Sequence, residues 1–426
     1  MQKIKILLVL LFLSVANHVL ASQLDVLSYN VTIEPDIEQQ HVVGFVLIQY
    51  KLPMDESSFV LYSGNLEIDT VTGTSVKKFI KLDNKLLIEL YEEREGINEV
   101  TIQYRGNPTK SLLFDQSKNQ AYTVYFTQYW MVCNFSTNDK ATIKLNIHVD
   151  KELTCVANGE LLEIKEKEGK QVYQWHQSFE SPAYTFGFAI GKFEKFENAS
   201  NEVKIINYAQ DYSPKELEQI FTETSNMISF FEKKSGIKYG HSSYFQILIG
   251  NHYQEMSGFS VLKESYGRMV LNDSTETNLI SHELAHQWWG NRITCKSLNH
   301  FWLNEAIATY MSAAYNEQRF GVVKYKADID SYFRVYQDIK NRNKDKALVF
   351  KDWSNPTRDD RNIVYFKGAY VLHLLRQKVG DKIFWDAIKY YSQTYFDKSV
   401  TTKDFKGAIE EIAERNLDDF FNEWVF

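Results

Sequence analysis

The sequence predicts an α+β protein of two domains, a β-rich N-terminal domain followed by a mainly helical C-terminal domain. Residues 143–149 alternate strictly between apolar and polar side chains, which is typical of a half-buried strand, and similar patterns recur through the first half. The stretch 194–203 is polar and has no periodicity, and beyond it apolar residues recur at helical spacing. A chain of 426 residues is long enough for two or three domains. We therefore place an N-terminal β-sheet domain at 22–198 and a second domain at 199–426.

Residues 1–21 have the pattern of a signal peptide. Lys3 and Lys5 provide a positive start, and the uncharged run 6–16 is rich in leucine. Cleavage is expected after Ala21. An uncleaved anchor is the alternative, but the run is shorter than the roughly 20 residues that a membrane span needs. We expect an exported protein, periplasmic or secreted, with no transmembrane segment in the mature chain.

Short strands follow one another through the N-terminal half. Alternation at 100–104 ends in the turn cluster 105–108, where glycine, asparagine and proline gather. Short strands at this density favour a sandwich or a saddle-shaped sheet. Further strands are expected at 45–52, 59–62, 86–91, 172–175 and 184–190.

The C-terminal half reads as helices around one short strand. Ser213 and Glu216 flank Pro214 in the arrangement of a capping box, with proline at the first helical position. A strand is expected at 244–249, just before the region richest in candidate ligands. Helices are expected at about 277–289, 303–319, 323–341, 367–379, 382–395 and 402–415.

Charge and cysteine content exclude some classes of protein. The formal net charge of −7 argues against a nucleic-acid partner, which would favour a basic surface. Three cysteines are too few for a disulfide framework. Cys133 and Cys155 could pair after export, which would leave Cys295 as a free thiol.

A group of histidines and carboxylates predicts a catalytic metal site. His282 and His286 are four residues apart, so in a helix both imidazoles lie on one face and can reach the same ion. Glu305 lies nineteen positions further on, in the apolar stretch 301–306, where a carboxylate needs a partner such as a metal. Three ligands leave one position open, as in catalytic zinc sites. We predict one Zn²⁺ held by these three residues, with Glu283 as general base and then general acid.

The same residues resemble those of a known family. His282-Glu283-x-x-His286, followed by eighteen intervening residues that end in Asn304 and then by Glu305, is similar to the pattern of gluzincin metallopeptidases of the aminopeptidase N and leukotriene A hydrolase type. The resemblance implies a β saddle domain followed by a thermolysin-like, mainly α-helical zinc peptidase domain that acts on a peptide or protein substrate. Segments that share it are 286–291, 302–305, 156–159 and 187–191.

The family also carries a tyrosine in a Tyr-x-Lys-Gly motif, which stabilises the oxyanion of the tetrahedral intermediate. The corresponding segment is 365–368, so the resemblance implies this role for Tyr365. A phenol suits the role because it donates a hydrogen bond to developing negative charge.

A loop before the metal helix departs from the family pattern. Aminopeptidases of this type carry Gly-x-Met-Glu-Asn, whose glutamate holds the α-amine of the substrate. Alignment on Met256 puts Ser257 at the acidic position, and a hydroxyl cannot give the charge-assisted bond that an ammonium group needs. Glu255 could take over, although on an extended backbone it is displaced by about 6–7 Å. We therefore take Glu255, Met256, Ser257 and Gly258 as substrate-binding candidates.

Gln128 is a further candidate, because the resemblance places a residue of the N-terminal domain in the substrate site. Many relatives add C-terminal domains that are expected to be missing here, and a more open cleft would follow. The sequence thus predicts a zinc-dependent, aminopeptidase-like enzyme. The alternatives are an endopeptidase or other metallopeptidase, because of Ser257, and a catalytically inert peptide-binding relative. The side-chain preference is left open.

Overall fold

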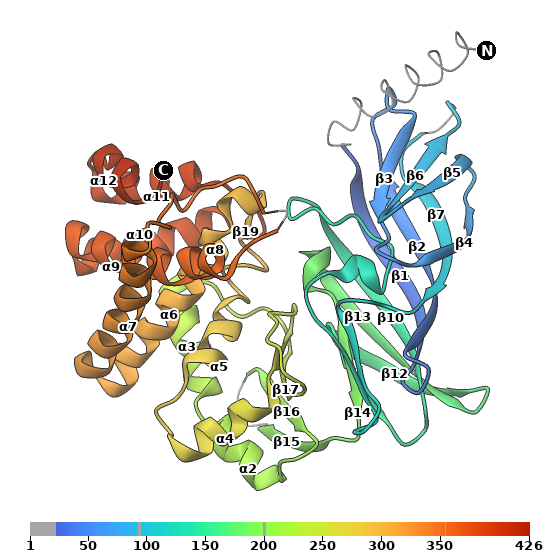
Figure 1. Cartoon of the computed structure of the whole chain (residues 1–426), viewed down its shortest axis with the longest axis horizontal. Coiled ribbons are helices and arrows are strands. Elements are labelled where there is room, and N and C mark those ends of the chain that lie inside the picture. Colours follow the sequence, from blue (N-terminus) through green and yellow to red (C-terminus); the bar gives the residue numbers. More distant parts are fainter. Residues whose placement is uncertain (1–22, 93–94, 199–201, 354) are drawn as a thin grey trace.

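Two domains lie side by side in the computed structural model, which describes residues 23–92, 95–198, 202–353 and 355–426 (Figure 1). The N-terminal domain consists of β-sheets, and helices dominate the C-terminal domain. The predicted α+β class with two domains is therefore confirmed. The predicted signal peptide lies outside the described residues.

A seven-stranded sheet forms the body of the N-terminal domain, in the order β12-β13-β10-β1-β2-β7-β4. β1 pairs in parallel with β10, and its other neighbour, β2, is antiparallel. Alternate side chains such as Val31 and Ile33 are buried, which is what the period-two pattern predicts. The bounds are β1 Asp25–Asp36, β2 His41–Lys51, β4 Glu67–Thr72, β7 Asn98–Gly106, β10 Lys140–Val149, β12 Glu160–Lys167 and β13 Lys170–Pro182.

Two smaller sheets complete this domain. One has the order β3-β6-β5 and the other the order β11-β14-β9-β8. The strand expected at 184–190 is wrong in its first part, because Ala183–Thr185 form a 3-10 turn before β14 begins. The other strands predicted in this domain overlap β2, β3, β6, β7, β10 and β13. The bounds are β3 Ser58–Tyr62, β5 Val76–Leu82, β6 Lys85–Leu90, β8 Leu112–Asp115, β9 Gln120–Thr123, β11 Thr154–Ala157 and β14 Phe188–Gly191.

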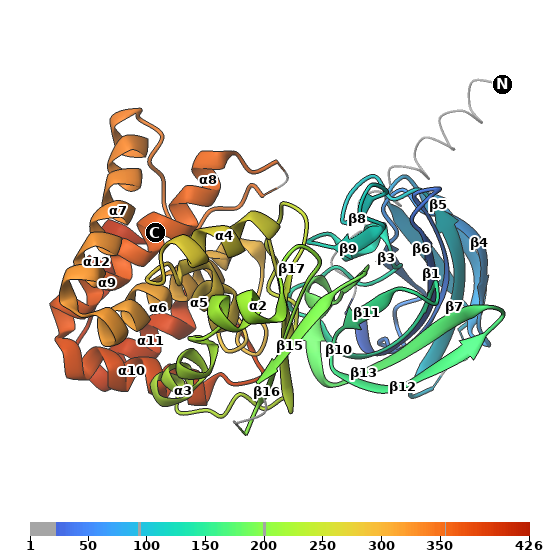
Figure 2. The ribbon, with the colours of Figure 1, turned by 90° about the horizontal axis from the view of Figure 1, so that it is seen from below.

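A four-stranded sheet, β15-β16-β17-β18, stands between the two domains (Figure 2). On β17, Phe245 and Ile247 pack into the core of the N-terminal domain, whereas Tyr244 and Leu248 pack into the helical core. β15, which precedes the predicted domain boundary, pairs with β16, which follows it. The bounds are β15 Glu194–Asn198, β16 Lys204–Ala209, β17 Ser243–Leu248 and β18 Phe259–Leu262.

The helices of the second domain follow the predicted order. The capping box of Ser213 and Glu216 is present at the start of α2. The helix expected at 277–289 ends at Ala285, because the chain turns sharply through Gly290, whose φ is +145°. The bounds are α2 Pro214–Ile220, α3 Thr224–Ser235, α4 Glu264–Asn272, α5 Asn278–Ala285, α6 Trp302–Phe320, α7 Val322–Asn341, α8 Arg358–Asn362, α9 Gly368–Val379, α10 Asp381–Thr394, α11 Thr402–Ala413 and α12 Asp418–Trp424.

Two short strands, β19 Thr294–Cys295 and β20 Ser399–Val400, pair in parallel at the edge of the helical domain. All three cysteines are buried and free, so the possible pairing of Cys133 with Cys155 is not formed. Within the described residues, no helix combines the length and the apolar character that crossing a membrane would require.

Candidate metal centre

Three side chains, from α5, from the residue that directly follows it and from α6, meet at one point in the second domain. The Nε2 atoms of His282 and His286 are 3.0 Å apart, and Glu305 Oε2 lies 3.4 and 3.5 Å from them. Ligand atoms bound tetrahedrally to zinc at about 2.0–2.1 Å are about 3.3–3.4 Å from one another. The spacing of the three atoms therefore matches three corners of a zinc tetrahedron.

Outer contacts orient both imidazoles toward this point. His286 Nδ1 lies 3.0 Å from the carbonyl oxygen of Trp289, which can only accept, so this nitrogen donates and Nε2 faces the other two side chains. His282 Nδ1 lies 3.3 Å from the hydroxyl of Thr309 on α6. A Cβ at Gly290 would be 2.7 Å from His286 Nδ1, so glycine lets the chain turn closely past the ring.

The donor set fits a divalent cation. Glu305 Oε2 is buried and has no hydrogen-bond partner within the described part of the chain. Without a metal, burial opposes ionisation of Glu305, but the His286 charge and contacts with both imidazoles outweigh it and lower its pKa to about 2. Burial likewise opposes the charge on His286, but Glu305, Glu255 and Glu283 together raise its pKa to about 10. The surrounding carboxylates thus favour a positive charge here, and Zn²⁺ would supply it with matching ligand types.

Glu283, which is on α5, lies beside the three predicted ligands. Ligand atoms of Glu283, Glu255 and His286 all lie within 4.8 Å of one another. Burial raises the pKa of Glu283 well above its ordinary value; the His286 charge opposes this shift, and the charges of Glu255 and Glu305 add to it. A carboxyl group with a raised pKa at this position is suited to hold and transfer a proton.

Tyr365 stacks on one of the histidines. It lies in a π-helical turn at Ile363–Lys367, and its ring is 5.6 Å from that of His282 with an interplanar angle of 17°. Burial raises the pKa of Tyr365 well above its ordinary value, and the charges of Glu305 and Glu255 raise it further. The phenol therefore remains protonated at neutral pH and can donate a hydrogen bond.

In the loop before α5, the side chains do not lie as the alignment on Met256 predicts. The Ser257 side chain is fully buried and accepts a hydrogen bond of 3.2 Å from the hydroxyl of Ser181 on β13, away from the metal cluster. Glu255 instead turns its carboxylate toward Glu283. The structure therefore corrects the expected position of Ser257, whose side chain does not face the metal cluster. The acid that this loop provides is Glu255, two residues earlier.

Neither of the other loop candidates, Met256 and Gly258, contributes a side chain to the cluster. Met256 packs into the core of the N-terminal domain. Gly258 has a φ of +82°, and its N–H donates to Gln287 Oε1 at 2.9 Å. Gln287 in turn donates to the carbonyl of Met256 at 3.0 Å, so a side chain just beyond His286 fixes the backbone of the loop.

The expected contribution of Gln128 is not seen, and a neighbour lies closer to the site. Gln128 is buried in the 3-10 turn Thr127–Tyr129, with no described contact to the cluster. Tyr125 lies nearer: burial raises its pKa, and the charges of Glu283 and Glu255 add to that rise. Tyr125 has a φ of +58°, which is uncommon for a non-glycine residue. No periodicity or motif in the sequence distinguishes it.

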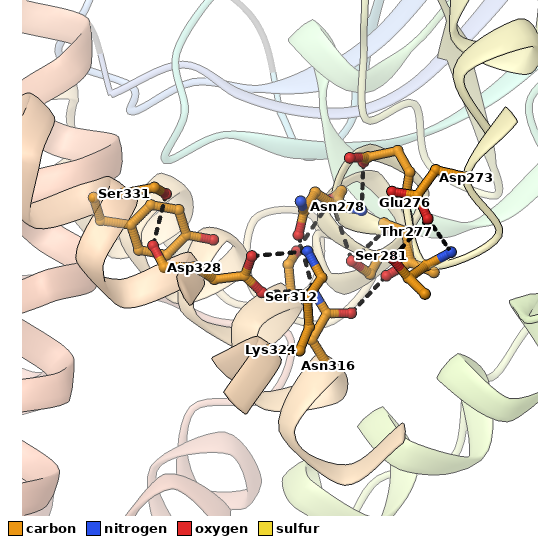
Figure 3. A network of polar contacts seen from close by, with 12 residues as sticks. Asp273, Glu276, Thr277, Asn278, Ser281, Ser312, Asn316, Lys324, Asp328 and Ser331 are labelled. Atoms are coloured by element: carbon orange, nitrogen blue, oxygen red, sulfur yellow. Dashed lines mark hydrogen bonds and ion pairs between the residues drawn. The ribbon is translucent and has the colours of Figure 1, made fainter. Parts of the chain in front are cut away.

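A buried polar network holds the start of the metal helix, as Figure 3 shows. Thr277 donates to Asn316 Oδ1 at 2.6 Å, and Asn316 donates to Asn278 Oδ1 at 3.0 Å and to Asp328 Oδ2 at 2.7 Å. Asn316 is on α6 and Asp328 on α7, so three helices meet through one amide. At the other end of α5, Asn304 donates to the Tyr184 hydroxyl, which donates to the carbonyl of Gly290.

Comparison with known proteins agrees with the fold. Residues 26–185 match the Peptidase M1 N-terminal domain, and residues 220–424 match the Peptidase family M1 domain. Fold and ligands together define a two-domain metalloprotein with an H-E-x-x-H helix and a more distant glutamate. The chain belongs to peptidase family M1, and the resemblance read from the sequence is confirmed.

The curated relatives are longer. "Probable aminopeptidase 2" of Sulfurisphaera tokodaii is 25% identical over 303 residues, which is 67% of this chain and 38% of that protein. "Leucyl aminopeptidase" of Saccharolobus solfataricus is 26% identical over 301 residues, with the same two coverages. The chain thus spans less than half the length of these two relatives.

Among solved structures, an M1 zinc metallopeptidase from Deinococcus radiodurans matches along almost the whole length of both chains. Its TM-score is 0.77 at 20% identity, with 94% of this chain and 93% of that chain covered. A mutant of that protein bound to a Tyr-Ser-Ala substrate has a TM-score of 0.78 at 20% identity, with 94% of both chains covered. This likeness shows a shared two-domain fold.

Proposed function

We propose that this protein is a zinc-dependent aminopeptidase. The observation that carries the proposal is the position of the Glu255 carboxylate, which shares a cluster with Glu283 and His286. In a peptide, a single α-carbon separates the terminal amine from the first carbonyl. A carboxylate this close to the metal cluster can therefore bind the α-ammonium group only if the first peptide bond lies at the centre.

His282, His286 and Glu305 would hold one zinc ion. When bound, the ion supplies Lewis acidity that polarises a peptide carbonyl and acidifies water. Glu283 accepts a proton from the attacking water and gives it to the leaving amine, which the raised pKa of its carboxyl group favours. Tyr365 donates a hydrogen bond to the oxygen on which negative charge develops. Glu255 binds the free amine and sets the register of the substrate.

The alternative of an endopeptidase was based on the alignment of Ser257 with the family's amine-binding glutamate. With Ser257 bonded to Ser181 and Glu255 in the cluster, that argument no longer applies. The reading as an inert relative has no support in the ligand set, because His282, His286 and Glu305 converge at metal-binding distances.

Matched peptides with free and acetylated N-termini test the proposal. We expect hydrolysis of the free-amine peptides, from the first bond, at least about a hundredfold faster than hydrolysis of the acetylated ones. Glu255→Gln should remove most of this discrimination, since an amide lacks the charge that pairs with ammonium. Equal rates on both peptides by the unaltered protein would refute amine recognition.

The variant Glu283→Gln tests the catalytic role of Glu283 without removing any of the three predicted metal ligands. This variant should keep its zinc content and lose hydrolysis of every peptide, because the proton acceptor is gone while the three ligands remain. Undiminished hydrolysis with bound zinc would refute the role of Glu283.

We also propose that the protein is exported, on the basis of residues 1–21. Mature protein recovered from the periplasm or medium should begin at Ser22 in N-terminal sequencing. A mature chain that starts at Met1 would contradict cleavage.

A further inference from the structure

Gln254 connects the two domains at the amine end of the proposed substrate site. Its side chain is 1% exposed. Gln254 Nε2 donates to Glu255 Oε2 at 2.9 Å, and Gln254 Oε1 accepts from the backbone N–H of Tyr125 at 2.8 Å. One amide therefore contacts both a carboxylate of the catalytic domain and the backbone of the N-terminal domain.

The backbone of Gln254 is itself fixed. Its N–H donates to the carbonyl of Val261 and its carbonyl accepts from the N–H of Val261, both at 3.0 Å. Val261 belongs to β18, which forms part of the sheet between the domains. The amide is thus mounted on a rigid element, as is required of a group that positions others.

The partner on the N-terminal domain has an unusual conformation. Tyr125 is held at a φ of +58°, which a non-glycine residue adopts only when its surroundings enforce it. The residue is 43% exposed, and its ring lies 6.3 Å from those of His252 and Phe126. The hydrogen bond from its N–H to Gln254 is one contact that enforces this conformation.

The family loop named in the sequence analysis has methionine directly before its glutamate. With Glu255 as that glutamate, the residue in the methionine position is Gln254. A methionine thioether cannot donate to a carboxylate and is only a weak acceptor. The link between Glu255 and Tyr125 therefore depends on the glutamine of this chain.

We propose that Gln254 is a positioning residue that fixes the Glu255 carboxylate and the Tyr125 ring relative to each other, so that the N-terminal domain forms an aromatic wall beside the bound amine. The proposal rests on the aminopeptidase function above and deepens it. The first residue of the substrate would lie between the carboxylate and this wall. Its recognition would then depend on both domains.

The test compares Gln254→Met with the unaltered protein, both loaded with zinc. Methionine has a similar volume and removes both hydrogen bonds. We expect the KM for free-amine peptides to rise about tenfold, as for one lost hydrogen bond to a charged group. The kcat should change less than about twofold, and acetylated peptides should be cleaved at an unchanged rate. Peptides with an aromatic first residue should be affected most.

Gln246→Met is the matched control. Gln246 is also fully buried and donates to Asn207 Oδ1 and Thr224 Oγ1 at 2.8 and 3.0 Å, outside the site. This variant should lose stability without a change in the ratio of rates on free and acetylated peptides. If Gln254→Met does not fold, Gln254→Asn serves instead, because the shorter amide stays buried and polar but cannot reach both partners.

The outcomes separate this proposal from the function on which it rests. A free-amine KM unchanged in a folded Gln254 variant, with discrimination intact in the unaltered protein, overturns the role of Gln254 alone. Absence of discrimination in the unaltered protein overturns the aminopeptidase function instead. A parallel loss of kcat on both kinds of peptide also overturns the proposal, since it indicates general damage. A raised KM confined to free-amine peptides supports it.

Discussion

Gly368→Ala offers a sharp test of how the metal centre and Tyr365 are held together. Gly368 begins α9 directly after the π-helical turn that carries Tyr365. A Cβ at this position would lie 2.5 Å from the Cβ of Ala306, the residue after Glu305 on α6. Added volume here therefore pushes the turn that carries Tyr365 away from the helix that carries Glu305.

The expected magnitude follows from two opposing effects. Alanine favours a helix over glycine by about 0.5–1 kcal/mol. Forcing a methyl group into a packed interface costs about 1–3 kcal/mol. We expect a net loss of about 1–2 kcal/mol in the free energy of unfolding. The kcat should fall about 10- to 100-fold, because a displacement of about 1 Å at a reacting group costs about that much.

Two variants make the assay specific. Gly407→Ala on α11 is the matched control, because a Cβ there meets nothing within 4 Å. It should gain about 0.5–1 kcal/mol and keep kcat. The double variant Gly368→Ala with Ala306→Gly removes the colliding methyl group and should restore kcat to within about threefold. Urea unfolding and peptide hydrolysis, each measured on zinc-loaded protein, give both quantities.

The reasoning would be refuted if Gly368→Ala matched Gly407→Ala in stability and kept full kcat. It would also be refuted if the double variant were no more active than the single one. Either result would mean that contact between α6 and α9 does not position Tyr365.

Three further predictions concern the same centre. Zinc affinity should rise about tenfold per pH unit toward pH 10, because the metal displaces a proton from His286, whose pKa in the metal-free protein is raised to about 10; chelator competition from pH 6 to 9 measures it, and a flat profile would contradict it. Tyr365→Phe should lower kcat about 10²- to 10³-fold with unchanged zinc content, and a smaller effect than about threefold would exclude the oxyanion role. Asn316→Leu should destabilise the protein by about 2–4 kcal/mol and weaken zinc binding, since Asp328 loses a buried donor and α5 loses its anchor; unfolding and chelator titration together check it, and intact zinc affinity would show that the network does not reach the metal.

The loop that contains Glu255 and Ser257 shows what the sequence alone could not predict. On an extended chain, Glu255 and Ser257 fall on the same side, and a motif alone cannot say which one faces the metal. The choice is made by contacts far along the sequence: Gln254 pairs with Val261, and Ser257 bonds to Ser181 on the other domain. These contacts turn the loop so that Glu255 meets the centre.

Tyr125 is a second residue whose position the sequence alone does not predict. Its position depends on a backbone conformation that tyrosine disfavours, and this conformation is stabilised by a partner 129 residues away. Local propensity works against such a conformation, so no local pattern predicts it. The early end of α5 is a milder case, because the turn at Gly290 depends on its pairing with Ile293.

The sequence by itself determined the class of the fold, and it predicted the metal ligands and the proton acceptor. These features follow from local sequence patterns. A spacing of four residues places His282 and His286 on one helical face, and Glu305 is a charged residue within an otherwise apolar helix, where it needs a partner. Only the tertiary structure decided which acid accompanies Glu283 and which aromatic ring of the other domain lies beside it. Those relations join segments that are distant in the chain, and their free energies come from packing and buried hydrogen bonds that no single segment contains.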